Sequence, residues 1–224
     1  MNIYSQYTTV RLDYCNSTDF IKMALNDTRL YMPEMIRDSS LSRQCEFLAG
    51  RWCAIKAMEI LKVKNLFQPL VSQQNFPIWP TSVLGSISHS SHTAGAFVTL
   101  VNPSINGVGF DIETIFDKQT ASILANRILS KQERAFSCFF KTFEEFVSVV
   151  FSAKEAFYKG IYKIINKRIA FSVIEIQQIC VVNQYIEFIT KRDLITYYPK
   201  GSTFIVTYTL KPTWVETRFL LNTV

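Results

Sequence analysis

The sequence has 224 residues, of which 48 % are apolar and 14 % aromatic. With so many apolar side chains and 19 % charged residues the chain can bury a core, which excludes an intrinsically disordered protein. The 24 Lys and Arg residues outnumber the 18 Asp and Glu residues, giving a formal net charge of +6. This charge suits an anionic partner, such as nucleic acid, a membrane surface, a phosphorylated ligand or an acidic protein, and is equally compatible with an ordinary basic cytosolic protein.

The cysteines and the N-terminus indicate the compartment. The five cysteines are odd in number and form no CxxC pair, which argues against a disulfide framework or a structural zinc site and favours a reducing cytoplasm. The N-terminal residues lack a charged start followed by an apolar run, so no signal peptide is expected. We also find no apolar segment long enough to span a bilayer, and therefore expect a cytoplasmic protein without a membrane span.

The first half of the chain is expected to be helical early and stranded late. Residues 42–63 carry apolar side chains at a period near that of a helix, which predicts a long helix. Gly50 interrupts this helix at a cost of about 1 kcal/mol relative to Ala, so we expect tight packing or the close approach of a backbone or ligand there. Residues 86–88 and 94–101 are predicted to form strands.

The second half begins with a predicted strand at residues 108–113. Ser130 with Glu133 fits a capping box, and so does Thr142 with Glu145, which predicts two helices. The second of these helices is expected at about residues 143–165. Later runs rich in β-branched and aromatic residues predict strands at 171–176, 179–188, 203–210 and 215–220.

The order of these elements predicts the fold class. Helices precede strands in both halves, which indicates an α+β chain. Residues 102–107 are rich in turn-forming residues and lie near the midpoint. We therefore expect two units, at residues 1–103 and 107–224.

Two acidic residues form the first candidate site. Asp111 and Glu113 lie two residues apart on the predicted strand, so their carboxylates project from one face and can approach one cation. Carboxylates, water and substrate phosphates are the usual ligands of Mg²⁺ in proteins. The motif by itself is also compatible with the solvated end of a strand, which is the commoner case.

The long second helix carries the next candidate. Glu155 and Lys159 are an i,i+4 pair on one helix face, and Lys154 precedes them. The pair alone is compatible with a surface salt bridge worth a few tenths of a kcal/mol. The functional alternative places Glu155 on a metal or a nucleophile and Lys159 on a phosphate.

Both histidines of the chain lie in the segment of residues 85–92. His89 and His92 have i,i+3 spacing, but no third nitrogen or sulfur ligand is near in sequence, which disfavours zinc. A Ser-His hydrolase is also disfavoured because no GxSxG motif is present. Ser88 and His89 are better suited to hydrogen bonding with phosphate oxygens.

Together the motifs SxSH, GxGxDxE and KExxxK, in this order and spacing, resemble those of the 4′-phosphopantetheinyl transferases of the surfactin- and enterobactin-synthetase type. The segment of residues 43–54, RQCEFLAGRWCA, and Trp79-Pro80 leading into Gly85 are similar to the enterobactin branch. The resemblance covers residues 40–165 clearly and the two ends loosely.

The resemblance implies a fold and a reaction. The family folds as two similar α+β halves related by a pseudo-twofold axis, with a coenzyme A cleft between them. Its members use Mg²⁺ to transfer 4′-phosphopantetheine from coenzyme A to a serine of an apo carrier protein, here a peptidyl, aryl or acyl carrier of siderophore or nonribosomal peptide synthesis, and release 3′,5′-ADP. A monomer would suffice for such a cleft.

The resemblance also implies roles for residues. The expected metal ligands are Asp111, Glu113 and Glu155. The expected coenzyme A contacts are Arg43, Arg51, Ser88, His89, Lys154 and Lys159. Glu155, Lys159 and His89 are the expected catalytic residues, with Glu155 acting either as general base for the carrier serine or purely as a metal ligand.

The resemblance also shows one difference from the family pattern and suggests a surface for the carrier protein. The family usually has Trp at the position of Phe151, where Phe keeps the apolar anchor and loses the indole N–H. Carrier proteins present an acidic helix, which suits an enzyme of charge +6. Phe116 and Phe139–Phe140 are candidates for an apolar docking surface, although packing in the core is the better explanation for each of them.

Two other classes of function stay open at this point. A non-catalytic module that binds coenzyme A or a carrier protein could have the same fold, although the complete set of motif residues argues against it. A basic nucleic-acid-binding protein is supported by net charge and aromatic content alone, and no recognition motif for DNA or RNA is present. We therefore expect no nucleic-acid partner.

Overall fold

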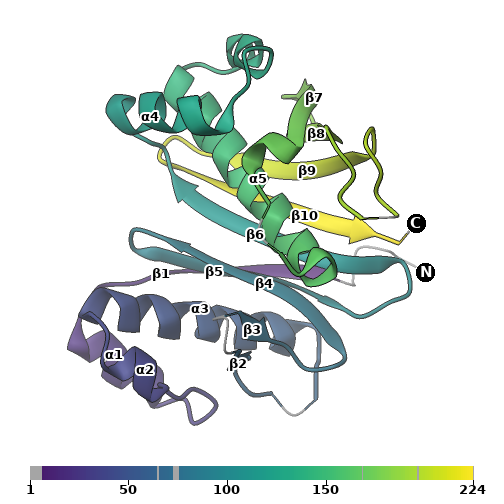
Figure 1. Cartoon of the computed structure of the whole chain (residues 1–224). Coiled ribbons are helices and arrows are strands. Elements are labelled where there is room, and N and C mark those ends of the chain that lie inside the picture. Colours follow the sequence, from purple (N-terminus) through teal and green to yellow (C-terminus); the bar gives the residue numbers. More distant parts are fainter. Residues whose placement is uncertain (1–6, 65, 73–75, 168, 196, 224) are drawn as a thin grey trace. The chain divides into compact units, whose positions relative to one another are not determined.

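The structure is a computed structural model that describes residues 7–64, 66–72, 76–167, 169–195 and 197–223. The chain divides into two compact units, Met1–Asn102 and Pro103–Val224. Each unit contains an antiparallel sheet with a long helix packed against it, which confirms the α+β class (Figure 1). Within the described residues, no helix is both long and apolar enough to cross a membrane.

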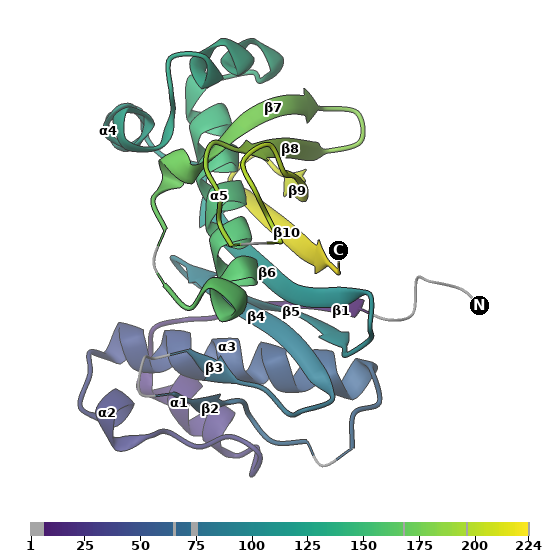
Figure 2. The same cartoon turned by 45° about the vertical axis from the view of Figure 1, so that its right-hand side comes forward.

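The first unit is built on a three-stranded antiparallel sheet of order β1-β5-β4. Its strands are β1 (Tyr7–Asp13), β4 (Val83–Ser90) and β5 (Thr93–Leu100). Its helices are α1 (Thr18–Leu25), α2 (Glu34–Arg37) and α3 (Leu41–Ile60), and β2 (Leu70–Val71) pairs with β3 (Pro77–Ile78). Helix α3 packs along the sheet (Figure 2).

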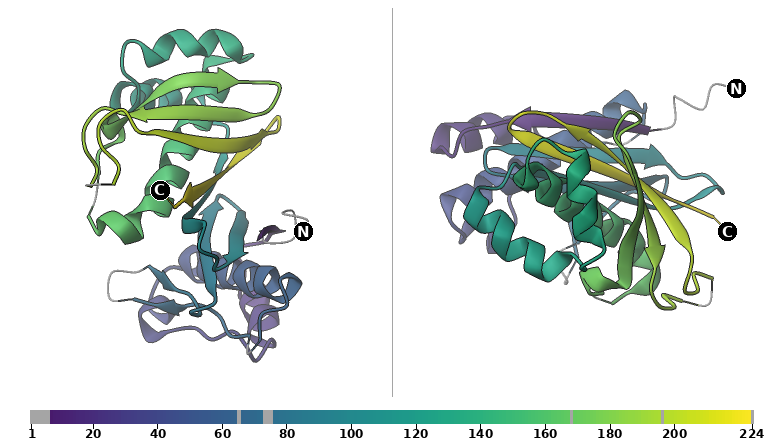
Figure 3. Two further views of the ribbon diagram at one scale, coloured as in Figure 1. Left: turned by 90° about the vertical axis from the view of Figure 1, so that its right-hand side faces the viewer. Right: turned by 90° about the horizontal axis from the view of Figure 1, so that it is seen from above.

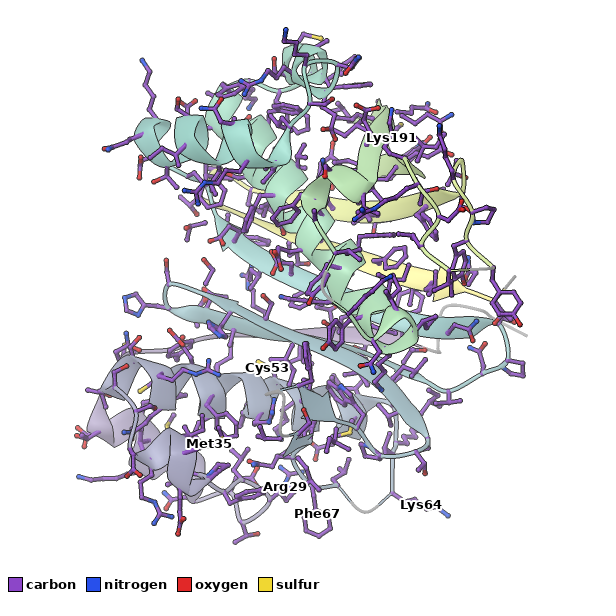
Figure 4. All side chains as sticks on the ribbon, in the orientation of Figure 1. Arg29, Met35, Cys53, Lys64, Phe67 and Lys191 are labelled. Carbon is purple, nitrogen blue, oxygen red and sulfur yellow. The ribbon has the colours of Figure 1, made fainter. Side chains whose placement is uncertain are left out.

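Helix α3 begins at the N-cap Ser40, whose side chain accepts a hydrogen bond from the Arg43 amide. The predicted helix is therefore confirmed, with its end at Ile60. A Cβ on Gly50 would lie 2.7 Å from Ile87 Cγ2 of β4, so tight packing explains this glycine. Cys53, also on α3, is buried with its thiol directed at the Ala94 carbonyl of β5 (Figure 4).

The second unit is built on a five-stranded antiparallel sheet of order β6-β10-β9-β8-β7 (Figure 3). Its strands are β6 (Ile105–Thr114), β7 (Ile174–Cys180), β8 (Tyr185–Thr190), β9 (Thr203–Leu210) and β10 (Trp214–Asn222). Its α-helices are α4 (Lys118–Ile128) and α5 (Phe143–Ile165), and short 3₁₀ helices lie at Glu133–Phe139 and Phe171–Val173. Helix α5 packs on β6, β10 and β9 and forms the centre of the core of this unit.

Helix α5 agrees with its prediction at both ends. The Thr142 side chain accepts a hydrogen bond from the Glu145 amide, and the Glu145 carboxylate accepts one from the Lys141 amide. The helix ends at Asn166, whose backbone is left-handed with φ 48°. The long helix that carries Glu155 is thus defined by local sequence signals.

Three expectations about elements were wrong. Ser130 and Glu133 form the reciprocal capping contacts, but a 3₁₀ helix follows them instead of an α-helix. The predicted strand 179–188 is interrupted by a turn between β7 and β8, and α4 was not predicted. The chain divides between Asn102 and Pro103, within the predicted break at residues 102–107, and strand β6 begins at Ile105. Finally, the predicted strand 171–176 starts as a 3₁₀ helix.

Candidate active site

Two glycines bring helix α5 directly onto strand β6. A Cβ on Gly109 would lie 1.7 Å from the Ala156 carbonyl oxygen, and one on Gly107 would lie 2.1 Å from that of Gly160. Side chains alternate along a strand, so the face that carries these glycines also carries Asp111 and Glu113. The glycines of the GxGxDxE motif therefore direct its carboxylates toward α5.

Lys159 of α5 meets the first of these carboxylates. Its Nζ lies 2.7 Å from Asp111 Oδ1, and the two side chains are 25 % and 8 % exposed. Asp111 is therefore a buried acid with a partly exposed cation beside it. Glu113 is partly buried, and its Oε1 accepts from the Thr114 amide at 2.9 Å.

Glu155 lies within electrostatic reach of both acids. Its burial raises the pKa of its carboxyl, and repulsion from Asp111 and Glu113 raises it further, while Lys159 lowers it. The structure therefore brings together Asp111, Glu113, Glu155 and Lys159, as the resemblance implies. Val108, Phe110 and Ile112 are buried on the opposite face of β6.

The donor set fits Mg²⁺ by its chemistry. Three carboxylates that disfavour one another's charge supply the hard oxygen ligands that this ion prefers, and a divalent cation would offset their repulsion. In the parts of the chain that the structure describes, no group of three or more His, Cys, Asp or Glu side chains is already arranged to hold a metal ion. Lys159 contacts Asp111 instead.

A second cluster lies in the first unit, between α3 and β4. Arg43 Nη1 is 3.1 Å from His89 Nε2, and the same nitrogen is 3.5 Å from Glu46 Oε2. His89 Nδ1 is 3.7 Å from that carboxylate oxygen. Since Arg43 and His89 are partly exposed, this cluster offers hydrogen-bond donors to an anion.

Arg51, two turns further along α3, is only 6 % exposed. Its guanidinium lies over the Phe47 ring at 4.8 Å, and its Nε has no hydrogen-bond partner among the described residues. Burial lowers its pKa to about 10, and the charge of Arg43 contributes to this shift. A buried cation with an unsatisfied donor near Arg43 suits an anionic ligand.

The structure does not bring the Ser88 hydroxyl to this cluster. Adjacent residues of a strand project to opposite faces, and His89 faces α3. Ser88 is buried on the other face of β4. Ser88 and His89 therefore project from opposite faces of β4, and the expected phosphate contact of Ser88 stays a prediction.

Lys154 requires a correction. It was expected to contact coenzyme A, but its side chain is 1 % exposed and its Nζ lies 2.7 Å from Glu133 Oε1. The same Nζ donates to the carbonyls of Ile128 at 2.7 Å and Ile174 at 3.4 Å. These three partners use all the donors of the ammonium, so Lys154 is structural in this fold.

Phe151 has the packing role expected for the apolar anchor. Its ring is 5.5 Å from that of Phe116 and 5.9 Å from that of Phe171. Phe116 and Phe140 both pack against the core of the second unit, whereas Phe139 is 51 % exposed. Of the aromatic candidates for docking, Phe139 is therefore the exposed one.

Sequence reasoning missed two acidic residues. Glu46 belongs to the His89 cluster, and Glu133 is the buried partner of Lys154. An i,i+3 spacing from Arg43 was the available signal for Glu46. Glu133 was noticed as a helix cap, but its pairing with Lys154 depends on tertiary structure.

Comparison with known proteins assigns both units to one class. A model described as the 4′-phosphopantetheinyl transferase N-terminal domain matches residues 32–99. A model of the 4′-phosphopantetheinyl transferase superfamily matches residues 107–209, which contain the carboxylate site. The chain belongs to the 4′-phosphopantetheinyl transferase superfamily.

Within that superfamily the chain is similar to the enterobactin synthase component D branch. It is 35 % identical to that protein of Escherichia coli K12 over 135 residues, which are 58 % of this chain and 62 % of the relative. It is 34 % identical to that of Salmonella typhimurium LT2 over 134 residues, which are 58 % of this chain and 54 % of the relative. The match thus spans little more than half the length of these relatives.

A solved structure is also similar. It is a holo-(acyl-carrier-protein) synthase from Bacillus anthracis in complex with CoA (3′,5′-ADP), at 23 % identity and a TM-score of 0.35. The likeness covers 54 % of this chain and 99 % of that one.

Proposed function

We propose that the protein transfers the 4′-phosphopantetheine group of coenzyme A to a serine of an apo carrier protein and releases 3′,5′-ADP. The observation that carries this proposal is the meeting of Glu155 and Lys159 of α5 with Asp111 of β6 on one face. The family membership and the similarity to enterobactin synthase component D favour a carrier of siderophore or nonribosomal peptide synthesis.

In this reaction the serine oxygen bonds to the β-phosphorus while the bond to the bridging oxygen breaks. Asp111 and Glu113 would hold Mg²⁺, which when bound supplies positive charge to the pyrophosphate oxygens. On binding, Lys159 would exchange its contact with Asp111 for a phosphate oxygen. It would then stabilise the charge that develops on that oxygen.

We assign the general base to Glu155. Its raised pKa makes it a better proton acceptor than an ordinary glutamate, and its part exposure leaves it accessible to a serine hydroxyl. The competing role, a metal ligand alone, predicts that Glu155→Gln loses Mg²⁺ affinity. The base role predicts intact Mg²⁺ affinity and a residual rate that no longer varies with pH.

The nucleotide end of coenzyme A is assigned to Arg43, Arg51 and His89. Arg43 and His89 are partly exposed donors, and Arg51 is a buried cation beside them. These groups match the multiple negative charge of a phosphorylated nucleotide. We propose that the protein works as a monomer in the cytoplasm, where carrier proteins and reduced thiols such as the five free cysteines coexist.

The test is product analysis with an apo peptidyl carrier protein, coenzyme A and Mg²⁺. Release of 3′,5′-ADP that requires the carrier serine, as judged with a carrier in which that serine is alanine, would support transfer. Tight coenzyme A binding without release would favour the non-catalytic module. Binding of an oligonucleotide that weakens steeply with salt, without coenzyme A binding, would instead favour a nucleic-acid-binding protein.

A further inference from the structure

The His89 cluster contains a carboxylate to which the proposed chemistry gives no role. Glu46 is 22 % exposed, and its Oε2 faces both Arg43 at 3.5 Å and His89 at 3.7 Å. Its Oε1 accepts from Ser42 Oγ at 3.2 Å, so the carboxylate is held from two sides. A carboxylate at this place would repel a phosphate, so its presence in a proposed phosphate-binding cluster calls for another role.

The contacts define the protonation of the imidazole. Arg43 has hydrogen-bond donors and no acceptor, so its Nη1 donates to His89 Nε2 at 3.1 Å. Because Nε2 accepts, the proton of the neutral ring is on Nδ1, which is the nitrogen that faces Glu46. The charged groups that face the ring include Arg43 and Glu46 of α3, and the residue opposite His89 on β5 is Ala94.

We propose that Glu46 is a positioning residue that orients His89 and makes it cationic when a phosphate binds. The phosphate oxygens replace Nε2 as acceptors for Arg43, and Nε2 takes up a proton from solvent and donates it in a hydrogen bond to the phosphate. Glu46 stabilises the resulting imidazolium at Nδ1. The inference rests on the proposed function, since the phosphate is taken to be that of the coenzyme A nucleotide.

Whether the substitution Glu46→Gln strengthens or weakens phosphate binding tests this role. Glu46→Gln keeps the size and an acceptor for Nδ1 but removes the charge. If Glu46 were only a repelling charge, the variant would bind a phosphate more tightly. In our account it binds about tenfold more weakly, the scale of one charge-assisted hydrogen bond.

The experiment is isothermal titration of the full chain with 3′,5′-ADP at neutral pH, in two buffers of different ionisation enthalpy. The wild type should take up protons on binding, and Glu46→Gln should take up fewer. Glu59→Gln makes the same charge change near the far end of α3 and should keep the wild-type proton uptake without weakening binding. Glu46→Asp, which retains the charge, should restore part of the proton uptake.

A double-mutant cycle with His89→Gln shows whether Glu46 acts through His89. We expect Glu46→Gln to have little further effect once His89 is replaced. Tighter binding by Glu46→Gln, unchanged proton uptake, or additive losses in the double variant would overturn the inference and leave the proposed function standing. A wild type that does not bind 3′,5′-ADP would overturn the proposed nucleotide site, and the inference with it.

Discussion

Glu155 shows how one residue balances stability against function. Its carboxyl is buried beside Asp111 and Glu113, which raises its pKa, so the native state favours the protonated form. In the window between the ordinary pKa of 4.5 and the raised value, the native state binds more protons than the unfolded state. The stability of the metal-free protein must therefore fall as pH rises through that window.

This gives a prediction for Glu155→Gln, which removes the charge that the site disfavours. In EDTA near neutral pH the variant should unfold at a higher urea concentration than the wild type. The gain should shrink as the pH falls and vanish below 4.5. Glu144→Gln, the same change in the first turn of α5, should show no such pH-dependent gain, and equal behaviour of both variants would contradict the account.

The Lys154–Glu133 pair gives a second prediction at this scale. Both side chains are almost fully buried, so Lys154→Met leaves a buried carboxylate without its cation. We expect a loss of about 3–5 kcal/mol in the free energy of unfolding. Lys191→Met breaks the pair with Glu175, in which Lys191 (labelled in Figure 4) is half exposed, and should cost less than about 1 kcal/mol.

The same pair separates a structural role from coenzyme A binding. In the double variant Lys154→Met/Glu133→Leu both charges are removed, and most of the lost stability should return. Its Michaelis constant for coenzyme A should then stay close to that of the wild type. A large rise in that constant in a stably folded double variant would return Lys154 to the coenzyme A site.

At the scale of elements, the contact between β6 and α5 determines the geometry of the carboxylate site. Gly109→Ala would place a methyl group 1.7 Å from the Ala156 carbonyl, so the helix must move away from the strand. We expect a loss of stability of about 1–3 kcal/mol or more, together with loss of transfer. Asn106→Ala, at an exposed position of the same strand, should affect neither property; a stable, active Gly109→Ala would refute this role.

Elements with strong local signals were predictable from the sequence. Helix α5 has a capping box and a continuous apolar face, so its limits followed from the sequence alone. Helix α4 was missed because its apolar stripe is narrow; its buried residues are Ala121, Ala125 and Ile128. The N-cap Asp117 was the signal that could have identified it.

The hairpin between β7 and β8 was missed for a different reason. Val181 and Val182 are β-branched residues in its turn, and they are 44 % and 92 % exposed. Such residues normally favour strands, so the sequence pattern did not mark the turn. Gln184, with a φ of 50°, completes the turn of the chain, and the turn contains no Gly or Pro that would have indicated it.

Site residues were predictable where spacing determines a shared face. Asp111 and Glu113 two residues apart, and Glu155 and Lys159 four apart, lie together as expected. The motifs alone did not show that adjacent residues point in different directions. Lys154 next to Glu155 and Ser88 next to His89 project in different directions, and their burial shows it.

At the scale of the whole molecule, each unit contributes a cluster of one predominant charge. The first unit holds the cations Arg43 and Arg51 with His89, and the second holds three carboxylates with Lys159. The first cluster can bind phosphates directly through its cations, whereas the second can bind them only through a divalent cation held by its carboxylates. The two family models match one unit each.

The most direct test of this account is intact-mass spectrometry of an apo peptidyl carrier protein incubated with the enzyme, coenzyme A and Mg²⁺. We predict a gain of about 340 Da, the mass of the phosphopantetheine arm, that disappears with EDTA and with Asp111→Ala. No gain on peptidyl, aryl or acyl carriers, from a folded protein that binds coenzyme A, would contradict the proposed transfer.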